Sequence, residues 1–401
     1  GSQNITLLVG ECAVTVNGTI EGDKLAMNIA VVAGGTLNVK VDFAGTKLSA
    51  DQSSEAAIQS FVVKIGDANV EGKIDGNNIS FIIPDGLENL TFAPTIVISD
   101  KATITPASGV EQDFSSPVIY TVTSEDGIVT TKYTVSVSGQ IRDFGFDEWE
   151  TIKSSTSGST EQYDVPKGLY GTSNPGIMTI NEMFGSNLPE LFSYTVSPVE
   201  GQSGKAAKLQ TVYTYMFLNG MDFNALLGGL VPYVTAGSLF TGIFKTDMNN
   251  TLNSTKFGVP FVGEPATFTG YYKYTPGTTY YNNKNEVVAD KTDECSIYAV
   301  LYEELLDEEN NNIPLNGDYN DPDLYIGSSK RIVMKAVLED GTAKSDWTKF
   351  SIPFKLLEGK SYDATKKYYL AIVCSSSAEG DYFMGAPGST LFIDSFTVTP
   401  Q

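Results

Sequence analysis

Histidine is absent from this chain of 401 residues. Its absence excludes a Ser-His-Asp triad, a Cys-His dyad and every zinc or iron site built on imidazole. The chemistry left to the chain is that of carboxylates, tyrosines, lysines and oxygen-bound cations such as calcium.

Cysteine is scarce. The three residues Cys12, Cys295 and Cys374 are far apart and odd in number. This usage excludes a dense disulfide framework and a zinc site made of cysteines alone. Because free cysteine packs like a small apolar residue, we expect buried thiols on strands.

Positive charge and long apolar runs are also lacking. The chain has 26 Lys and Arg against 48 Asp and Glu, a net charge of −22. Phosphate backbones and anionic membrane surfaces are repelled by such a surface, so no nucleic-acid partner is expected. No run approaches the roughly 18 apolar residues of a spanning helix. The opening Gly1-Ser2 resembles a cloning remnant, so a native signal or lipid anchor would lie upstream.

Glycine, proline and aromatic residues are plentiful. The chain contains 38 Gly and 17 Pro, and 11% of its residues are aromatic. Short alternating runs are bounded by Gly, Asn, Asp or Pro, and no long window has helical periodicity. The sequence therefore predicts an all-β protein built of sandwiches, with two or three domains at this length.

The first part of the chain, residues 1–47, predicts a small N-terminal β module. Residues 18–29 align without gaps on residues 72–83, and each copy has two apolar runs around an acidic-Gly turn. Such a pattern predicts a hairpin in each copy. Residues 1–47 are too short for a full sandwich, which leaves a partial Ig-like repeat or the remnant of a small barrel.

Residues 48–139 predict an Ig-like spacer domain. At least five strands with turn signals between them fit into about 90 residues. They are expected near residues 58–65, 79–83, 95–98, 118–123 and 131–137. The hairpin at 117–137 resembles the last two strands of bacterial Ig-like modules, and the resemblance implies a spacer that holds another domain away from a surface.

A turn-rich lead-in and an aromatic strand occupy residues 256–277, KFGVPFVGEPATFTGYYKYTPG. If 267–275 is a strand, Phe268, Tyr272 and Tyr274 share one face. Tyr271 and Lys273 share the other. Since both faces carry tyrosines, a central position in a sheet is predicted.

This stretch closely resembles the Bacteroidetes "putative carbohydrate metabolism domain" family, whose fold is a two-sheet jelly roll. Further runs that resemble the family lie at 143–150, 163–170, 172–176, 204–211, 347–354 and 388–398. The resemblance covers residues 140–401 and predicts a jelly-roll domain larger than the Ig-like module. Its motifs are specific in combination and weak singly.

The resemblance implies a carbohydrate-binding protein of the cell surface or periplasm that takes part in glycan capture or utilisation. An exported outer-membrane lipoprotein is expected, monomeric, with a poly- or oligosaccharide as partner. Two alternatives stay open. A glycoside hydrolase or lyase would need a pair of carboxylates in one cleft, one with a raised pKa. A structural or adhesive lipoprotein would need no concave aromatic face.

Sugar recognition requires flat aromatic faces against the C–H face of a pyranose, with polar groups around them. On 295–304 the alternation places Ile297, Ala299 and Leu301 on an apolar face. We therefore predict that the opposite face binds the glycan, with these residues: Tyr298, Tyr302 and Glu304, joined by Tyr271 and Lys273. The alternative is that these tyrosines only cover the sheet beneath a loop.

Two further aromatic residues are candidates for the ligand site. Trp149 is flanked by acids, which makes burial less expected. Tyr382 falls in a loop between two predicted strands, where binding residues are often displayed.

One metal site is predicted. In a jelly roll the first and last strands lie side by side, so Asp147 and Asp394 are expected to converge, and two carboxylates with nearby carbonyls suit a structural calcium. Asp147 departs from the Glu often found at this place in related jelly rolls and reaches less far. The alternative is that Asp394 caps the final turn and Asp147 is solvated.

Overall fold

The computed structural model describes residues 2–9, 12–33, 37–46, 52–84, 87 and 89–401. The chain divides into two units, Gly1–Phe81 with Asn89–Val137, and Ile82–Glu88 with Ser138–Gln401. The boundary predicted between residues 47 and 48 lies outside the described residues. Strands dominate both units, so the all-β prediction is confirmed. Among the described residues, no helix is long and apolar enough to cross a membrane.

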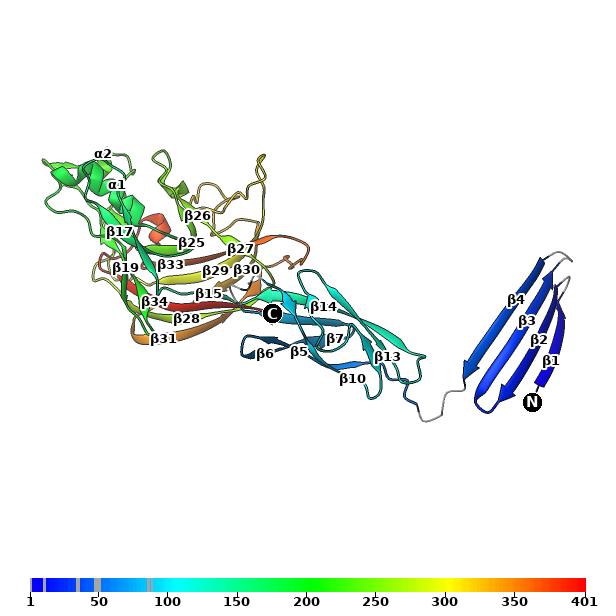
Figure 1. The fold of residues 1–401 in the computed structure, drawn as a ribbon. Coiled ribbons are helices and arrows are strands. Elements are labelled where there is room, and N and C mark those ends of the chain that lie inside the picture. Colours follow the sequence, from blue (N-terminus) through cyan, green and yellow to red (C-terminus); the bar gives the residue numbers. More distant parts are fainter. Residues whose placement is uncertain (1, 10–11, 34–36, 47–51, 85–86, 88) are drawn as a thin grey trace. The chain divides into compact units, whose positions relative to one another are not determined.

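The first four strands form an antiparallel sheet in sequence order (Figure 1). They are β1 (Ser2–Val9), β2 (Cys12–Glu21), β3 (Lys24–Ala33) and β4 (Leu37–Thr46). The β2–β3 turn needs a glycine because Gly22 has a φ of 59°. A second hairpin joins β7 (Lys73–Asp75) to β8 (Asn78–Ile83), where Gly76 has a φ of 58°. Both hairpins of the predicted repeat are therefore confirmed.

Residues 52–137 form the predicted sandwich. One sheet has the order β10-β5-β6, a second has the order β11-β13-β14-β8-β7, and β12 pairs with β9. The strands are β5 (Ile58–Ile65), β6 (Ala68–Glu71), β9 (Thr91–Phe92), β10 (Thr95–Ile98), β11 (Thr103–Thr105), β12 (Gln112–Asp113), β13 (Val118–Thr123) and β14 (Thr130–Gln140). Edge-to-face aromatic contacts fill the core; its rings are Phe61, Phe81, Phe92, Phe114 and Tyr120.

The second unit is a two-sheet sandwich. One sheet has the order β19-β20-β34-β28-β31, with β15 also paired to β34. Its strands are β15 (Arg142–Phe144), β19 (Val196–Glu200), β20 (Lys205–Gln210), β28 (Pro265–Thr275), β31 (Lys344–Pro353) and β34 (Thr390–Pro400). The first and last strands pair directly, with Arg142 opposite Val398, as the jelly-roll prediction requires.

The other sheet has the order β18-β25-β33-β29-β30-β32, and β26 and β27 pair with β25 and β33. Its strands are β18 (Tyr170–Thr172), β25 (Ser238–Phe244), β26 (Thr255–Phe257), β27 (Val259–Phe261), β29 (Ser296–Glu303), β30 (Ile332–Val337), β32 (Lys355–Leu356) and β33 (Tyr368–Ser375). The hairpin of β16 (Trp149–Lys153) and β17 (Gln162–Pro166) stands beside the sandwich strands as a two-stranded sheet.

The core between the two sheets includes both described free thiols. Cys295 and Cys374 are buried, as predicted, and burial raises the pKa of Cys295 to about 12. The side chain of Cys12 lies outside the described residues.

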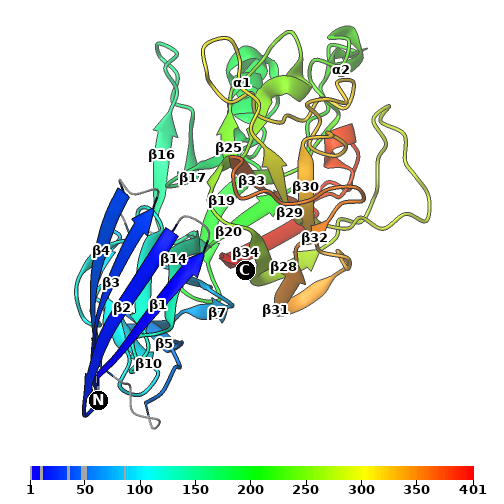
Figure 2. The same cartoon turned by 90° about the vertical axis from the view of Figure 1, so that its right-hand side faces the viewer.

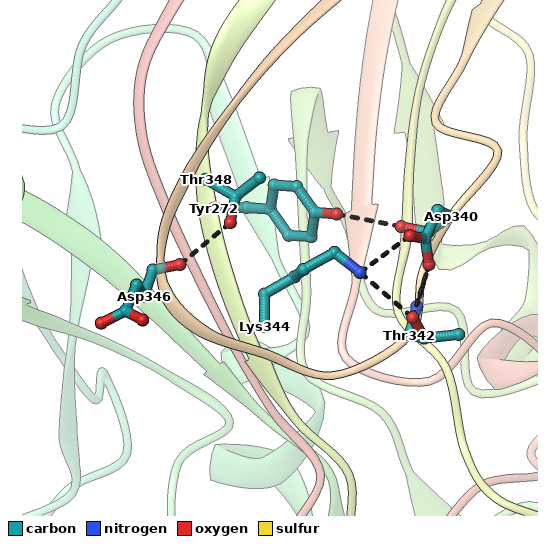
Figure 3. A network of polar contacts seen from close by, with 6 residues as sticks. All are labelled: Tyr272, Asp340, Thr342, Lys344, Asp346 and Thr348. Atoms are coloured by element: carbon teal, nitrogen blue, oxygen red, sulfur yellow. Dashed lines mark hydrogen bonds and ion pairs between the residues drawn. The ribbon is translucent and has the colours of Figure 1, made fainter.

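A polar network ties β28 to the β30–β31 connection (Figure 3). Tyr272 is buried and donates its phenol hydrogen to the Asp340 carbonyl at 2.9 Å. Lys344 Nζ lies 2.8 Å from Asp340 Oδ2. Hydrogen bonds from Lys344 and Thr342 lower the pKa of Asp340 to about 2. The core tyrosine is thereby satisfied at its polar end, as a buried phenol requires.

Two helices, which sequence periodicity did not predict, lie on the same side of the sandwich (Figure 2). Helix α1 (Asn174–Phe184) begins with a proline in its first turn, a favourable position because that N–H has no helical partner. Helix α2 (Phe223–Leu226) is capped by Asp222, which accepts from the Ala225 N–H. Short helical turns follow at η1 (Gly185–Asn187), η2 (Thr251–Ser254) and η3 (Gly380–Tyr382).

Candidate functional site

Strand β28 has the two faces that its sequence predicts. Phe268, Tyr272 and Tyr274 are buried in the main core. Tyr271 and Lys273 are partly buried on the opposite face, where Lys273 Nζ lies 4.8 Å from the centre of the Trp347 ring. β28 pairs with β34 on one side and β31 on the other, so its central position is confirmed.

Strand β29 also alternates as predicted, but its second face is not exposed. Ile297, Ala299 and Leu301 belong to the main core. Tyr302 on the other face is 0% exposed, donates to the Phe257 carbonyl at 2.6 Å and stacks on Tyr369. Its predicted role as an exposed platform is therefore wrong, because other segments of the chain cover Tyr302.

The cover comes from segments far away in the sequence. Phe257 of β26, Leu315 and Ile326 pack on this outer face with Tyr302 and form a second apolar cluster. Arg331 lies over the Tyr302 ring at 5.0 Å and donates to the Glu303 carbonyl. The outer face of β29 is thus a second core, apart from the half-buried Tyr298.

The predicted joint platform does not form. Tyr271 and Lys273 lie on β28, and Tyr298 and Tyr302 lie on β29 of the other sheet. Both pairs point away from the core that the two sheets share, so they face in opposite directions. Glu304 is partly buried just after β29, where its N–H donates to the Lys367 carbonyl.

The two loop candidates have different surroundings. Trp149 is partly buried against the main core, and its indole N–H donates to the Phe146 carbonyl at 2.6 Å. This packing makes Trp149 a poor sugar platform. Tyr382 is 40% exposed and stacks on Tyr319 with ring centres 5.1 Å apart.

The predicted pair Asp147 and Asp394 meets at one feature, the turn between β19 and β20. Asp394 is 2% exposed, and its Oδ2 accepts from the N–H groups of Gln202 and Ser203. Asp147 Oδ1 accepts from the Lys205 N–H at 2.9 Å. Gly204 has a φ of 62°, and a Cβ there would lie 2.0 Å from Asp147 Oδ1. The turn therefore requires glycine at this position.

These donors fit a backbone-capping role better than a calcium site. Calcium takes six to eight oxygen ligands, whereas Asp394 here already binds two backbone N–H groups and Asp147 binds one. Within the described parts of the chain, no group of three or more acidic or cysteine side chains is placed to hold a metal ion. Calcium binding by this pair stays a prediction.

Asp394→Ala is expected to lower the free energy of unfolding by about 2 kcal/mol, because two backbone N–H groups lose a charged acceptor. The loss should be the same in calcium and in chelator, measured by thermal and urea unfolding. If calcium instead raises the Tm of the wild-type protein and leaves that of Asp394→Ala unchanged, the calcium site is established.

The described surface carries an aromatic cluster that the sequence prediction missed. We call it the aromatic strip; it consists of Tyr213, Tyr215, Phe217, Tyr233 and Tyr281. Ring centres of Tyr213 and Tyr215 are 5.6 Å apart, and Tyr215 lies 5.7 Å from Tyr233 and 6.2 Å from Phe217. Tyr281 stacks on Tyr213 at 5.1 Å. Phe217 is 60% exposed and the others are partly exposed.

The strip results from the alternation of exposed and buried side chains along one segment. Thr214 and Met216 are buried between the strip residues of β21 (Val212–Tyr213) and β22 (Phe217–Leu218). Asn224 is 1% exposed and fixes this segment from behind, because it accepts from the Met216 N–H and donates to the Thr214 carbonyl. Partner strands are β23 (Met221–Asp222) and β24 (Val234–Thr235). The run Tyr-Thr-Tyr-Met-Phe was the sequence signal for it.

Polar groups border the strip. Tyr233 donates to Asp222 Oδ2 at 3.0 Å, and Tyr213 donates to Asn285 Oδ1 at 2.6 Å. Desolvation raises the pKa of Tyr213 and of Tyr233, and Asp222 raises that of Tyr233 further. Both phenols therefore stay protonated at neutral pH. The strip combines flat rings with a carboxylate and an amide, which is the composition that sugar recognition requires.

A cavity of about 250 Å³ lies on the outer face of β25, β29 and β33. Helix α1 and the loops around β26 and η3 complete its wall. Tyr298 lines this cavity, as do Phe240 and Val373 from the neighbouring strands. The predicted site residue Tyr298 therefore lines a cavity and not an open platform.

Comparison with known families shows which family the second unit resembles. The family model described as "Putative carbohydrate metabolism domain" matches residues 145–399, which is more than half of the chain. The chain belongs to this family. Residues 58–137 match the model described as "SGBP, N-terminal", and residues 1–46 match that of the calycin-like β-barrel domain. These matches support a glycan-related function for this chain.

Two solved structures similar to this family member come from Bacteroides. A protein described as a putative glycoside hydrolase from Bacteroides thetaiotaomicron is 31% identical, over 88% of this chain and 99% of that chain, with a TM-score of 0.51. Another of the same description, from Bacteroides vulgatus, is 26% identical over 65% of this chain and 98% of that chain, with a TM-score of 0.48. The comparison with curated proteins gives no significant match.

Proposed function

We propose that this protein binds a poly- or oligosaccharide without cleaving it, and that the aromatic strip is the binding surface. The observation that carries the proposal is the row of five neighbouring aromatic rings at the surface. The ring faces of such a cluster that remain exposed offer apolar surface to sugar C–H faces. Asp222 and Asn285 lie beside them to bind sugar hydroxyls.

Hydrolysis is less well supported by the carboxyl groups. A glycoside hydrolase needs two carboxyls that flank the scissile bond, one of them with a raised pKa. Burial raises the pKa of Asp293, but this residue is 2% exposed and accepts four hydrogen bonds from the protein itself. Such a carboxyl has no access to a substrate. Partial desolvation also raises the pKa of Asp381, whose carboxylate accepts from the Tyr325 hydroxyl. Asp381 lines the cavity beneath helix α1, but no second carboxyl among the described residues lines it, so the pair that hydrolysis needs is not present there.

The preceding modules support a place at the cell surface. Residues 58–137 match the N-terminal family of surface glycan-binding proteins. An Ig-like module in that position suits a spacer that presents the jelly roll to glycan. We extend the proposal to an exported, monomeric lipoprotein of the outer membrane that captures glycan.

Tyr215→Ala is expected to weaken glycan binding by about 1–3 kcal/mol, the range for flat rings stacked on aromatic side chains at other ligand sites. Tyr215 is chosen because it contacts three other strip rings. Binding is measured with the full chain by affinity electrophoresis in gels containing xylan, mannan, β-glucan, starch or pectin. Reducing-sugar release from the same polysaccharides should stay at background.

The matched controls are Tyr215→Phe and Tyr382→Ala. The phenylalanine variant keeps the ring and should bind nearly as the wild type does. The second removes a ring that is 40% exposed outside the strip and should leave binding unchanged. Loss of binding in Tyr382→Ala but not in Tyr215→Ala would move the site to the Tyr319–Tyr382 stack. Release of reducing sugar would overturn the non-catalytic part of the proposal.

A further inference from the structure

The cavity beneath helix α1 is chemically unlike the aromatic strip. Most of its wall is apolar carbon, contributed among others by Ile180, Phe184, Phe240 and Phe244. A sugar placed there would lose the hydration of its hydroxyl groups without gaining enough partners, which is unfavourable. The cavity therefore selects against the ligand class proposed for the strip.

One buried hydroxyl group among the residues that line this cavity has no hydrogen bond in the part of the chain that the structure describes. The Thr255 Oγ1 atom is buried without a hydrogen bond. Tyr298 also lines the cavity, and desolvation raises the pKa of its hydroxyl. Since buried polar groups are ordinarily paired, an oxygen atom that enters the cavity would give Thr255 a partner, and the Tyr298 hydroxyl lines the same space.

The size and the entrance suit a small ring compound. An apolar cavity of about 150 Å³ holds benzene, so about 250 Å³ gives room for two fused six-membered rings. Met183 and Met248 belong to the wall and are 51% and 43% exposed. Flexible, polarisable methionine side chains adapt to ligands of different shape.

We propose that this cavity binds a compact, largely apolar ring compound that carries one hydrogen-bonding oxygen, such as an aromatic alcohol. The rings contact the phenylalanine and isoleucine side chains, and the oxygen is bound by the hydroxyls of Tyr298 and Thr255. This site is separate from the strip and does not depend on glycan binding.

The test uses the full chain with 2-naphthol as the probe and naphthalene as the comparator, followed by saturation-transfer NMR and thermal shift. Gly176→Leu fills the cavity from α1. A Cβ at Gly176 has Phe244 Cζ as its nearest neighbour at 3.8 Å, an ordinary contact, and leucine is the better helix former. Gly145→Leu is the matched control, since a Cβ there meets nothing within 4 Å.

We expect saturable binding of 2-naphthol to the wild type and to Gly145→Leu, and at least tenfold weaker binding to Gly176→Leu. Tyr298→Phe should lower the affinity for 2-naphthol several-fold and leave that for naphthalene unchanged. If Gly176→Leu does not fold, Thr179→Leu fills the same cavity from the same helix. Absence of saturable binding, or equal binding to the filled variant, would overturn the proposal. Equal 2-naphthol affinity in Tyr298→Phe would overturn the hydrogen bond assigned to its hydroxyl.

Discussion

Tyr302→Ala is expected to destabilise the protein by about 3–5 kcal/mol, the cost of truncating a large buried ring. Tyr302 is 0% exposed and packs with Val300, Leu315 and Ile326. The variant loses this packing and leaves the Phe257 carbonyl without its phenol donor. Urea unfolding of the full chain measures the effect.

Two further variants separate the contribution of the buried Tyr302 ring from that of its hydrogen bond and from the effect of removing an exposed ring. Tyr302→Phe keeps the ring and removes only the hydrogen bond, so it should cost about 1 kcal/mol. Tyr382→Ala removes an exposed ring and should change stability by about 0.5 kcal/mol or less. A cost below about 1 kcal/mol for Tyr302→Ala would contradict the second core and restore an exposed tyrosine face on β29.

Asp293→Ala is expected to cost about 3 kcal/mol or more. The Asp293 Oδ2 atom accepts from Ser377 Oγ at 2.6 Å, from the Ala386 N–H at 2.8 Å and from Ser389 Oγ at 2.7 Å. All these groups are buried, and each one left unpaired costs about 1–3 kcal/mol. Asp293→Asn keeps an acceptor oxygen and should cost less. Equal stability of the alanine variant and the wild type would contradict the described network.

The same residue predicts a pH dependence. Burial raises the pKa of Asp293 above its unfolded value, so between the two values the folded state binds more protons. Stability from this group then falls as pH rises through that window, and increases as pH falls toward the unfolded pKa. The wild type should therefore gain stability relative to Asp293→Asn when the pH is lowered from neutral toward about 4. The opposite trend would contradict the assigned direction.

Strand faces were predictable from the sequence because side chains alternate with a period of two. This is why the inward residues of β28 and β29 were assigned correctly. The covering of Tyr302 was not predictable, since Phe257 is 45 residues before it and lies on another strand. Local alternation says which residues share a face and does not say what lies on that face.

The aromatic strip and helix α1 both have local signals in the sequence. Tyr213, Tyr215 and Phe217 alternate with Thr214 and Met216, which predicts one aromatic and one buried face. Ser173-Asn174-Pro175 is a typical helix start. The meeting of Tyr233 and Tyr281 with this segment depends on tertiary structure alone, because they lie far along the chain from Tyr213.

The most direct test of glycan binding by the strip compares the wild-type full chain with a variant in which Tyr213, Tyr215 and Phe217 are all alanine, on one glycan array. None of these three side chains belongs to the buried core clusters that the described residues of this unit form, so the Tm should change little. We expect the wild type to bind at least one class of poly- or oligosaccharide and the triple variant to bind none. Glycan binding by the folded triple variant at wild-type affinity would contradict this expectation.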